Sequence, residues 1–445
     1  RSSAASDVYK RQVKERDLGG YIEGEHNLSH EGNCWVYNNA KVFENARVYD
    51  NAKILNNANI LHYATVFGNA IVANNAVVSD TARVFGNAMV YDNARVYGVA
   101  EMFDQACVYG NAKLHGFARI YCHANVSDSA EVHGNAVVYD NAQVFGYAKV
   151  YGSADISGYA KVNGGAEVYG SARVFGDAMV YGKAQVYGLA KVFGDTKVCS
   201  DAKIFDHAKV LGEAIVRGEA SVFGCVRVNG VAEMFDQACV YGNAKLHGFA
   251  RIYCHANVSD SAEVHGNAVV YDNAQVFGYA KVYGSADISG YAKVNGGAEV
   301  YGSARVFGDA MVYGKAQVYG LAKVFGDTKV CSDAKIFDHA KVLGEAIVRG
   351  EASVFGCVRV NGNVILSSSA NVSSPSDIVW FSHAGSKNST LSVYRGKRGN
   401  LLVTIDCFTG TVDEFLTRSE QEHNKRIHRE FQLLIEVAKS RILGE

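Results

Sequence analysis

The chain has 445 residues, of which 44 are Lys or Arg and 45 are Asp or Glu, so its formal net charge is −1. Dedicated nucleic-acid binding needs a basic face and mimicry of DNA needs a large acidic excess, so this balance argues against both roles. No apolar run approaches the length of a transmembrane helix, which is about 18 residues or more. We therefore expect neither nucleic acid nor a membrane as a partner.

Residues 1–12 look foreign to the fold. The run from Ser2 to Gln12 reads SSAASDVYKRQ, which is similar to a translated sequencing adapter. We interpret this segment as an adapter-derived artefact, exclude it from fold reasoning, and expect the natural amino terminus to be missing.

Between residues 35 and 378 the sequence repeats every six residues. From Ala40 to Ala370 the register holds for 56 hexads, with Ala first in 51 of them and Val, Ile, Leu or Met third in all 56. A fixed short period indicates a solenoid. The first and third residues of a strand point to the same side, here inward, while the second and fourth point outward. The fifth is usually Gly, Asp or Asn, which accept the left-handed backbone of a tight corner.

This pattern resembles the hexapeptide repeat of left-handed parallel β-helices, in which three hexads close one triangular coil. The resemblance implies an all-β solenoid in which residues 18 apart lie directly above one another. Its left hand comes from the resemblance alone, because ordinary parallel crossovers are right-handed. On this spacing we expect a ladder of stacked corner amides at Asn57, Asn75, Asn93 and Asn111.

Residues 13–34 precede the regular hexads, and we expect them to cap the first coil. Ile22, Leu28 and Cys34 stand at six-residue steps before Ala40, which predicts that they continue the inward alanine column. A solenoid needs such caps because each coil is stabilised only by its neighbours.

Residues 98–230 recur without a substitution as residues 230–362. The offset of 132 residues is a whole number of hexads, so the repeat phase survives. It is not a whole number of three-hexad coils, so we expect the second copy to be turned by one face. Such identity indicates either a very recent duplication or an assembly error.

Outward aromatic residues fall in columns at 18-residue spacing. The column that we single out as a candidate binding surface consists of Tyr49, Phe67, Phe85, Phe103, Tyr121 and Tyr139. A second column, on the next face, consists of Tyr151, Tyr169, Tyr187, Phe205 and Phe223. Flat rings dock carbohydrates or protein partners by stacking. The alternative is that the rings stack on one another and stiffen the sheet.

Metal and cofactor chemistry finds little support in the sequence. His115 and His133 stand 18 apart, in a column with Tyr97 and Tyr151, so ring stacking explains them as well as a shared metal does. No third ligand accompanies them and the ten cysteines show no CxxC spacing. We expect no metal site, no disulfide framework and no cofactor.

Hexapeptide β-helices are best known from CoA-dependent acyltransferases, in which a histidine acts as the general base. The candidate bases are His62, His115, His133 and His207. Each lies inside an ordinary hexad, and no inserted loop frames an acceptor pocket. The resemblance therefore supplies no catalytic residue.

Residues 379–445 depart from the repeat. Three strand patterns are expected at Val379–Phe381, Leu391–Arg395 and Leu401–Ile405. A capping box at Thr411–Glu414 opens one helix, and a second follows near residues 425–442. This β-β-β-α-α module, with its run from Cys407 to Phe415, resembles the carboxy-terminal module of hexapeptide-repeat proteins of phages and prophages. Those proteins are often labelled polymer-forming cytoskeletal or putative acetyltransferase-like.

These observations predict a non-catalytic structural or binding solenoid of phage or prophage type, acting as a rigid scaffold, a spacer or a self-associating element. The alternatives are a CoA-dependent hexapeptide acyltransferase and a carbohydrate- or protein-binding rod that uses the aromatic columns. We expect a protein partner or self-association, with carbohydrate as a further candidate. The expected location is the cytoplasm of a bacterial host cell or the phage itself.

Overall fold

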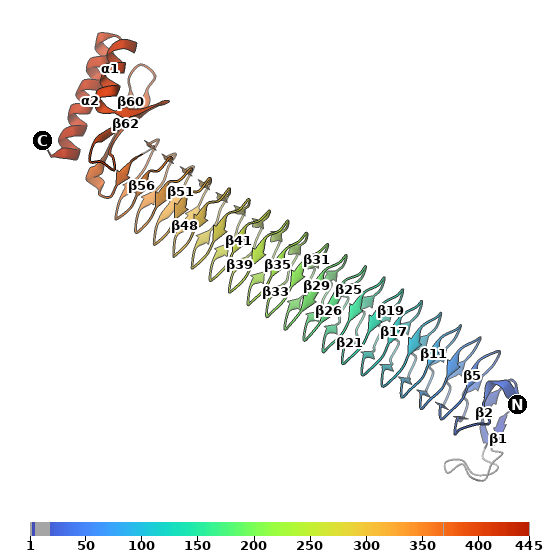
Figure 1. The fold of residues 1–445 in the computed structure, drawn as a ribbon. Helices are drawn as coiled ribbons and strands as arrows, with labels where there is room; N and C mark the ends of the chain where they lie inside the picture. The colour runs from blue at the N-terminus through green and yellow to red at the C-terminus, as the bar shows by residue number, and fades with distance from the viewer. Residues whose placement is uncertain (1, 5–17, 368, 445) are drawn as a thin grey trace. The chain divides into compact units, whose positions relative to one another are not determined.

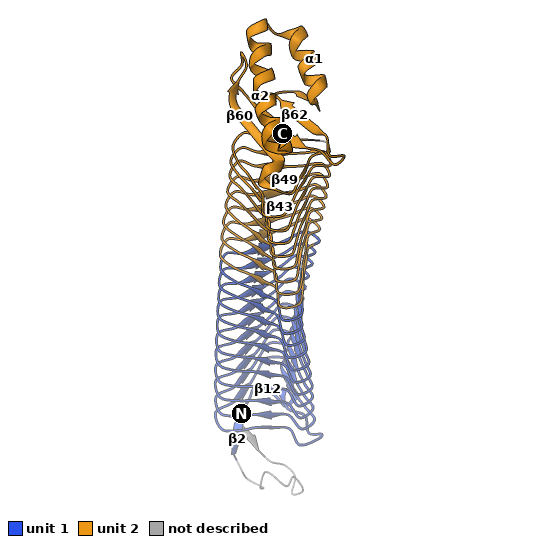
Figure 2. Ribbon diagram, turned by 90° about the vertical axis from the view of Figure 1, so that its left-hand side faces the viewer, with its two compact units in different colours: residues 1–225 blue, residues 226–445 orange. Residues whose placement is uncertain are grey.

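A computed structural model describes residues 2–4, 18–367 and 369–444 (Figure 1). The chain forms two compact units, residues 1–225 and residues 226–445 (Figure 2). Each unit is built from stacked β-coils, and the second also carries an antiparallel sheet and two helices. The prediction of a β-solenoid with a small carboxy-terminal α/β module is confirmed.

Each coil strand covers the second and third residues of its hexad. In unit 1 these strands recur every six residues from β3 (Trp35–Val36) to β34 (Ser221–Val222). In unit 2 they run in the same way from β35 (Arg227–Val228) to β59 (Asn371–Val372). Four strands are one residue longer: β26 (Arg173–Phe175), β29 (Lys191–Phe193), β48 (Arg305–Phe307) and β51 (Lys323–Phe325).

Within each unit the strands form parallel sheets, and paired residues are 18 apart in the sequence. In unit 1, for example, Arg95 lies opposite Lys113. The amide of Arg95 donates to the carbonyl of Ala112 at 2.9 Å. The period of the side-chain columns on the surface is therefore one coil.

The interior of each coil is filled by the first and third residues of the hexads. Ala94 and Val96 are fully buried, as are their equivalents along both units. Thr196 is an exception to the alanine rule that remains fully buried. Its hydroxyl donates to the carbonyl of Phe193 at 2.7 Å, so the extra polar atom has a partner.

The corners explain why aspartate recurs at the fifth position. Asp128 has a φ of 58°, and its carboxylate accepts a hydrogen bond from the amide of Gly146 in the next coil at 3.0 Å. We call this contact the corner bond. It also joins Asp50 to Gly68, Asp80 to Gly98, Asp92 to Gly110, Asp104 to Cys122, Asp140 to Gly158 and Asp206 to Gly224 in unit 1. In unit 2 it joins Asp260 to Gly278, Asp272 to Gly290 and Asp338 to Gly356.

The predicted amide ladder is confirmed. Each step of the ladder from Asn57 through Asn75 and Asn93 to Asn111 is a side-chain hydrogen bond of 3.3 Å. A second ladder runs through Asn33, Asn51, Asn69 and Asn87, and a third through Asn38, Asn56, Asn74 and Asp92. Exposed polar side chains in this part of unit 1 thus bond along the coil stack.

The amino-terminal segment caps the first coil in a register that differs from the prediction. It contains β2 (Leu18–Ile22) and the short 3-10 helix η1 (Glu25–Asn27). Ile22 pairs with Val42 and Leu28 bridges to Val48, so both lie in the valine column and not in the alanine column.

The reason for the difference is an enlarged corner. Leu28 is 20 residues from its partner Val48, whereas Trp35 is 18 residues from its partner Lys53. The corner between Leu28 and Cys34 therefore holds two extra residues. Cys34, which follows this corner, is buried in the alanine column as predicted.

Two further features complete this end. The buried Asn27 side chain accepts from the amides of Glu23 and Gly24, and its amide group donates to the carbonyls of Glu44 and Ala46. A strand inside the segment that we interpreted as an adapter, β1 (Ser2–Ala4), pairs antiparallel with β2. The other residues of that segment lie outside the described residues.

The carboxy-terminal module has four strands, one more than predicted. After the 3-10 turn η2 (Pro375–Asp377), the module consists of β60 (Ile378–Ala384), β61 (Ser389–Arg395), β62 (Leu401–Ile405), β63 (Phe408–Thr411), α1 (Val412–Glu422) and α2 (Lys425–Leu443). The strands pair antiparallel in chain order. The extra strand, β63, folds back on β62 through a tight turn in which Asp406 has a φ of 49°.

The helices pack on this sheet around a separate apolar core. The core includes Leu391, Val393, Val403, Phe415, Phe431 and Ile435. The predicted capping box is confirmed, because Thr411 Oγ1 accepts from the amide of Glu414 and Glu414 Oε2 accepts from the amide of Thr411. Figure 2 shows both helices on the carboxy-terminal part of unit 2.

Candidate functional site

The six aromatic residues that the sequence singled out form one continuous stack in unit 1. Neighbouring rings from Tyr49 to Tyr139 have centroids 4.7–5.1 Å apart and planes within 10° of parallel. Each occupies the fourth position of its hexad and is half-buried. The 18-residue period thus places all six side chains together, as the column predicted.

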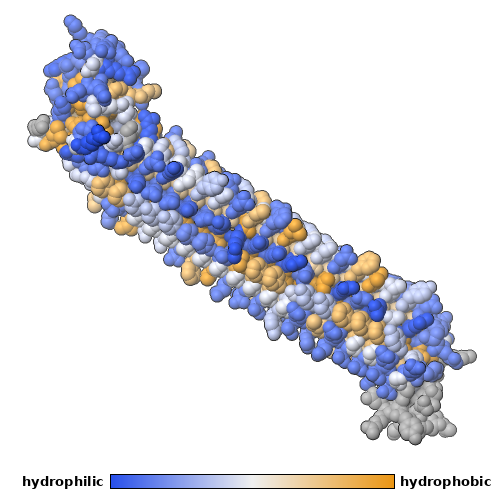
Figure 3. Space-filling view, viewed as in Figure 1, coloured by the Kyte–Doolittle hydropathy of each residue, from blue (hydrophilic) through white to orange (hydrophobic). Residues whose placement is uncertain are grey.

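Stacking limits what this column can bind. The faces of the four inner rings contact neighbouring rings, so a ligand meets ring edges along the column and free faces only at its two ends. The guanidinium of Arg83 also lies over Phe67 and Phe85, at 5.6 and 5.3 Å from their centroids. On the face that Figure 3 shows, hydrophobic and hydrophilic residues alternate in small patches. The arrangement stabilises coil–coil contact directly, while binding at these residues stays a prediction.

A longer stack in unit 1 contains the two histidines. It runs through Tyr97, His115, His133, Tyr151, Tyr169, Tyr187, Phe205 and Phe223. His115 Nε2 lies 2.9 Å from Glu131 Oε1. Burial, and secondarily the neighbouring His115, lowers the pKa of His133. Burial, assisted by Glu167, raises the pKa of Tyr151 to about 12.

The four histidines considered as general bases lie in separate places. His115 and His133 belong to the stack, and their ring faces contact other rings. His62 stands at a corner between two carboxylates, 3.0 Å from Asp80 and 3.6 Å from Glu44. His207 lies at another exposed corner. Among the described residues no group of three or more His, Cys, Asp or Glu side chains is placed to hold a metal ion.

The carboxy-terminal module contains a small cavity of about 160 Å³. Its lining includes Gly385, Cys407, Arg418, His423 and Phe431. Arg418 forms an ion pair with Glu422 at 2.8 Å and lies over the ring of Phe408 at 5.4 Å. The cavity is a recess between the turn after β62 and the two helices.

Strand β61 closes the last coil of unit 2 with side-chain oxygens. The amide of Ile365 donates to Ser392 Oγ at 3.3 Å, and the amide of Ser367 donates to the hydroxyl of Tyr394 at 3.2 Å. Tyr394 is fully buried, and its hydroxyl lies 2.6 Å from Thr404 Oγ1. These hydroxyls take the place of the backbone carbonyls that a further coil would supply. We call this arrangement the hydroxyl lid.

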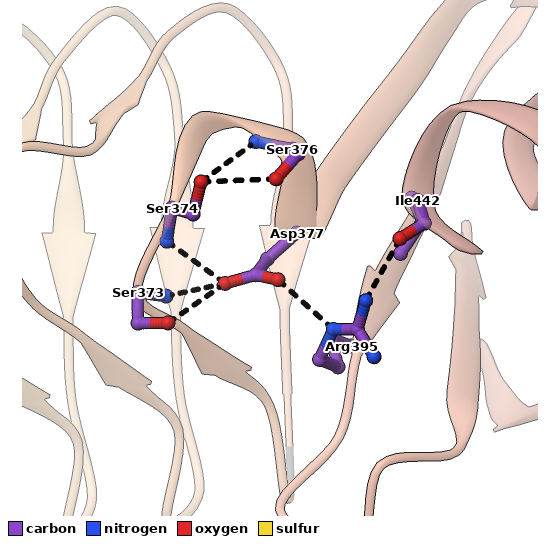
Figure 4. A network of polar contacts seen from close by, with 6 residues as sticks. All are labelled: Ser373, Ser374, Ser376, Asp377, Arg395 and Ile442. Carbon is purple, nitrogen blue, oxygen red and sulfur yellow. Dashed lines mark hydrogen bonds and ion pairs between the residues drawn. The ribbon is translucent and has the colours of Figure 1, made fainter. Parts of the chain in front are cut away.

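A buried carboxylate fixes the chain as it leaves the last coil (Figure 4). Asp377 accepts hydrogen bonds from the amide and hydroxyl of Ser373, both at 2.9 Å, and from the amide of Ser374 at 2.8 Å. Its second oxygen pairs with Arg395 Nε at 2.9 Å, and Arg395 also donates to the carbonyl of Ile442. Burial alone would raise the pKa of Asp377, but these hydrogen bonds outweigh it and hold the pKa below its usual value.

Sequence reasoning missed the hydroxyl lid, the Asp377 network and the corner bond. Each is built from single Ser, Tyr, Asp and Arg side chains whose partners are remote in the sequence. The one available signal was the recurrence of aspartate at the fifth position, where glycine would satisfy the backbone.

Comparison with known proteins supports the repeat. A family model described as "YdcK Beta solenoid repeat" matches residues 82–98, 172–188 and 304–320. A search of curated proteins found no match. Among the described residues, no helix has both the length and the apolar character needed to cross a bilayer. Over those three segments, the chain therefore shares the β-solenoid repeat of the YdcK model.

Proposed function

We propose that this chain is a structural β-solenoid that acts as a scaffold or spacer and presents its carboxy-terminal module to a protein partner or a second copy. The observation that carries the proposal is the use of surface side chains along the coil stack. Ring stacks, amide ladders and corner bonds all join residues 18 apart. Side chains that a binding or catalytic surface would direct outward are used here to hold coil on coil.

The finer expectations belong to this proposal. The hexad pattern supports a left-handed β-helix with three hexads per coil, because the observed 18-residue register fits three hexads. The resemblance to phage and prophage proteins suggests a phage-associated or bacterial cytoplasmic location. The module offers an exposed surface on α2, where Leu433, Val437 and Leu443 are 39–47% exposed. Such apolar side chains are suited to contact with a protein.

The experiment is the solution mass of residues 13–445, measured by light scattering over a range of concentrations. A monomer, or a series of species that grows with concentration, supports the scaffold or self-associating element. A discrete trimer that also gains thermal stability with CoA would overturn the proposal in favour of the acyltransferase. The double variant Leu433→Ser and Val437→Ser tests whether the exposed surface of α2 mediates any association. Leu189→Ser and Leu321→Ser are the matched control, since both residues are also exposed but lie at corners of the coils.

A further inference from the structure

Unit 2 carries a groove of about 930 Å³ along one face of its coils. Its floor is a column of second-position residues, and its wall is a column of sixth-position residues. The wall consists of Ser285, Ser303, Leu321, His339 and Cys357. The floor consists of Asp287, Arg305, Lys323, Lys341 and Arg359. All of these residues belong to unit 2.

Four cations in the floor stand directly opposite one another. Arg305 pairs in register with Lys323, Lys323 with Lys341, and Lys341 with Arg359. On the same strands Phe307 and Phe325 stack 4.7 Å apart, which sets the rise from one cation's strand to the next. The column therefore spans about 14 Å over three such steps. Like charges placed directly opposite each other oppose the pairing of their strands.

Other columns of the protein avoid this conflict by alternating charge. On a neighbouring face of unit 2, Lys245 forms an ion pair with Glu263 at 2.8 Å. In unit 1, Glu101 lies between Arg83 and Arg119 and contacts both. Among the described residues, none of the four groove cations has an ion-pair partner within 4.0 Å. The stack itself does not account for this column, because aligned cations weaken the stack.

The carboxylates around the groove leave its positive charge uncompensated. Asp287 closes one end of the floor, opposite Arg305 in the next coil. Asp338 stands at the corner beside His339, but its carboxylate accepts the corner bond from Gly356 at 3.2 Å. Four cations thus face two carboxylates, one of which already accepts a backbone hydrogen bond.

We propose that this groove binds a linear acidic polysaccharide of the polyuronate type. Such a chain carries one carboxylate per sugar, and a fully extended row of these charges complements a row of cations that repeats once per coil. The hydroxyls of Ser285 and Ser303 and the imidazole of His339 can bond sugar hydroxyls. Leu321, which is 51% exposed, offers an apolar contact to a ring face. The inference goes beyond the structural role proposed above and does not depend on it.

A nucleic acid fits the groove less well. Non-specific binding of single strands relies on aromatic rings on which the bases stack. Among the residues that line the groove, His339 supplies the one ring. The groove cations and hydroxyls match an anionic sugar chain, which needs charge and hydrogen bonds but no stacking platform.

The first copy of the duplicated segment contains the same column. In unit 1, Arg173 pairs in register with Lys191, and Lys191 with Lys209. Any binding test must therefore change both copies. The groove variant carries Lys323→Glu and Lys341→Glu together with Lys191→Glu and Lys209→Glu.

The duplication also provides a matched control. Lys293 and Lys329 are exposed in unit 2 and flank Met311 in register, so their strands carry no like-charge conflict. Lys161 and Lys197 flank Met179 in the same way in unit 1. The control variant changes these four lysines to Glu and so alters the net charge by the same amount.

The test is binding of polygalacturonate to the full chain by calorimetry at several salt concentrations. Neutral dextran and single-stranded poly(dT) serve as comparison ligands. We expect polygalacturonate to bind, its affinity to fall as salt rises, and the groove variant to lose about tenfold or more in affinity. The control variant should stay within about twofold of the parent chain, because a charge outside the site acts only through long-range, screened attraction.

Several outcomes would overturn the proposal. They are absence of polygalacturonate binding to the parent chain, an equal loss in the control variant, or binding of poly(dT) as tight as that of polygalacturonate. The last result would make the groove a nucleic-acid site. Circular dichroism and thermal melting check that the variants fold. The milder groove variant, with Gln at the same four positions, keeps the test valid if Glu proves disruptive, and it should also weaken binding.

Discussion

Replacement of Asp377 by Ala should destabilise the carboxy-terminal module by about 3 kcal/mol. The side chain accepts three hydrogen bonds from Ser373 and Ser374 and pairs with Arg395, and the carboxylate is almost fully buried. Breaking a buried ion pair costs about 3–5 kcal/mol. The lower end applies because about a third of the Arg395 side chain is exposed, so water can solvate the guanidinium that is left behind.

The assay is urea unfolding followed by tryptophan fluorescence. The chain has two tryptophans, so a Trp35→Phe background leaves Trp380 in β60 as the reporter of the module. The control is Asp327→Ala, since Asp327 is exposed at a corner of unit 2 and its loss should change stability by no more than about 0.5 kcal/mol. A loss for Asp377→Ala that is as small as this control would refute the reasoning.

The pH dependence gives the experiment a second arm. The folded state holds the pKa of Asp377 below its unfolded value, which is about 3.9. The unfolded chain therefore binds the proton more readily, and this part of the stability is present above about pH 4 and lost as pH falls through the folded pKa. The gap between parent and Asp377→Ala should narrow at pH 3. An equal gap at pH 3 and pH 7 would show that the charge of Asp377 contributes nothing.

Three further predictions concern the coil stack. Asp128→Gly should cost about 1 kcal/mol in urea unfolding, because it removes the corner bond to Gly146, and Asp128→Ala about 1–2 kcal/mol more because its φ stays positive; equal losses would rule out backbone strain. Phe85→Leu removes two ring stacks and should lower unfolding stability by about 1–3 kcal/mol, whereas no loss would mean that the stack is only a consequence of the period. The NMR titration midpoint of His133 should lie below the usual 6.5 and move upward in His115→Phe, so its contribution to stability is present above about pH 6.5 and lost as pH falls; a midpoint at or above 6.5 would contradict the burial argument.

Spacing alone predicted most of the coil stack. Once residues 18 apart lie above one another, the Asn57 ladder and the ring stack from Tyr49 follow from the sequence, because identical side chains at one coil spacing are in contact. The capping box at Thr411 was likewise readable, since all its partners lie within one helical turn. Both successes depend on contacts with a known sequence separation.

The failures have the opposite cause. Ile22 and Leu28 were assigned to the wrong column because an irregular corner contains two extra residues, which a period cannot reveal. Strand β63 was missed because its Phe-Thr-Gly-Thr sequence has little apolar alternation. The hydroxyl lid joins Ile365 to a serine 27 residues away, and no local pattern specifies such a contact.

The hydroxyl lid has a consequence for how copies of this protein can assemble. A parallel coil that ends with unpaired amides is a template on which another chain can add a strand. Here Ser392 and Tyr394 already accept from Ile365 and Ser367, so strand addition at this point would have to displace a buried tyrosine. Growth by joining coils end to end is therefore blocked at the carboxy-terminal end of unit 2. Any assembly that involves this end must use the sides of the coils or the outer surface of the helices, which favours bundles over simple extension.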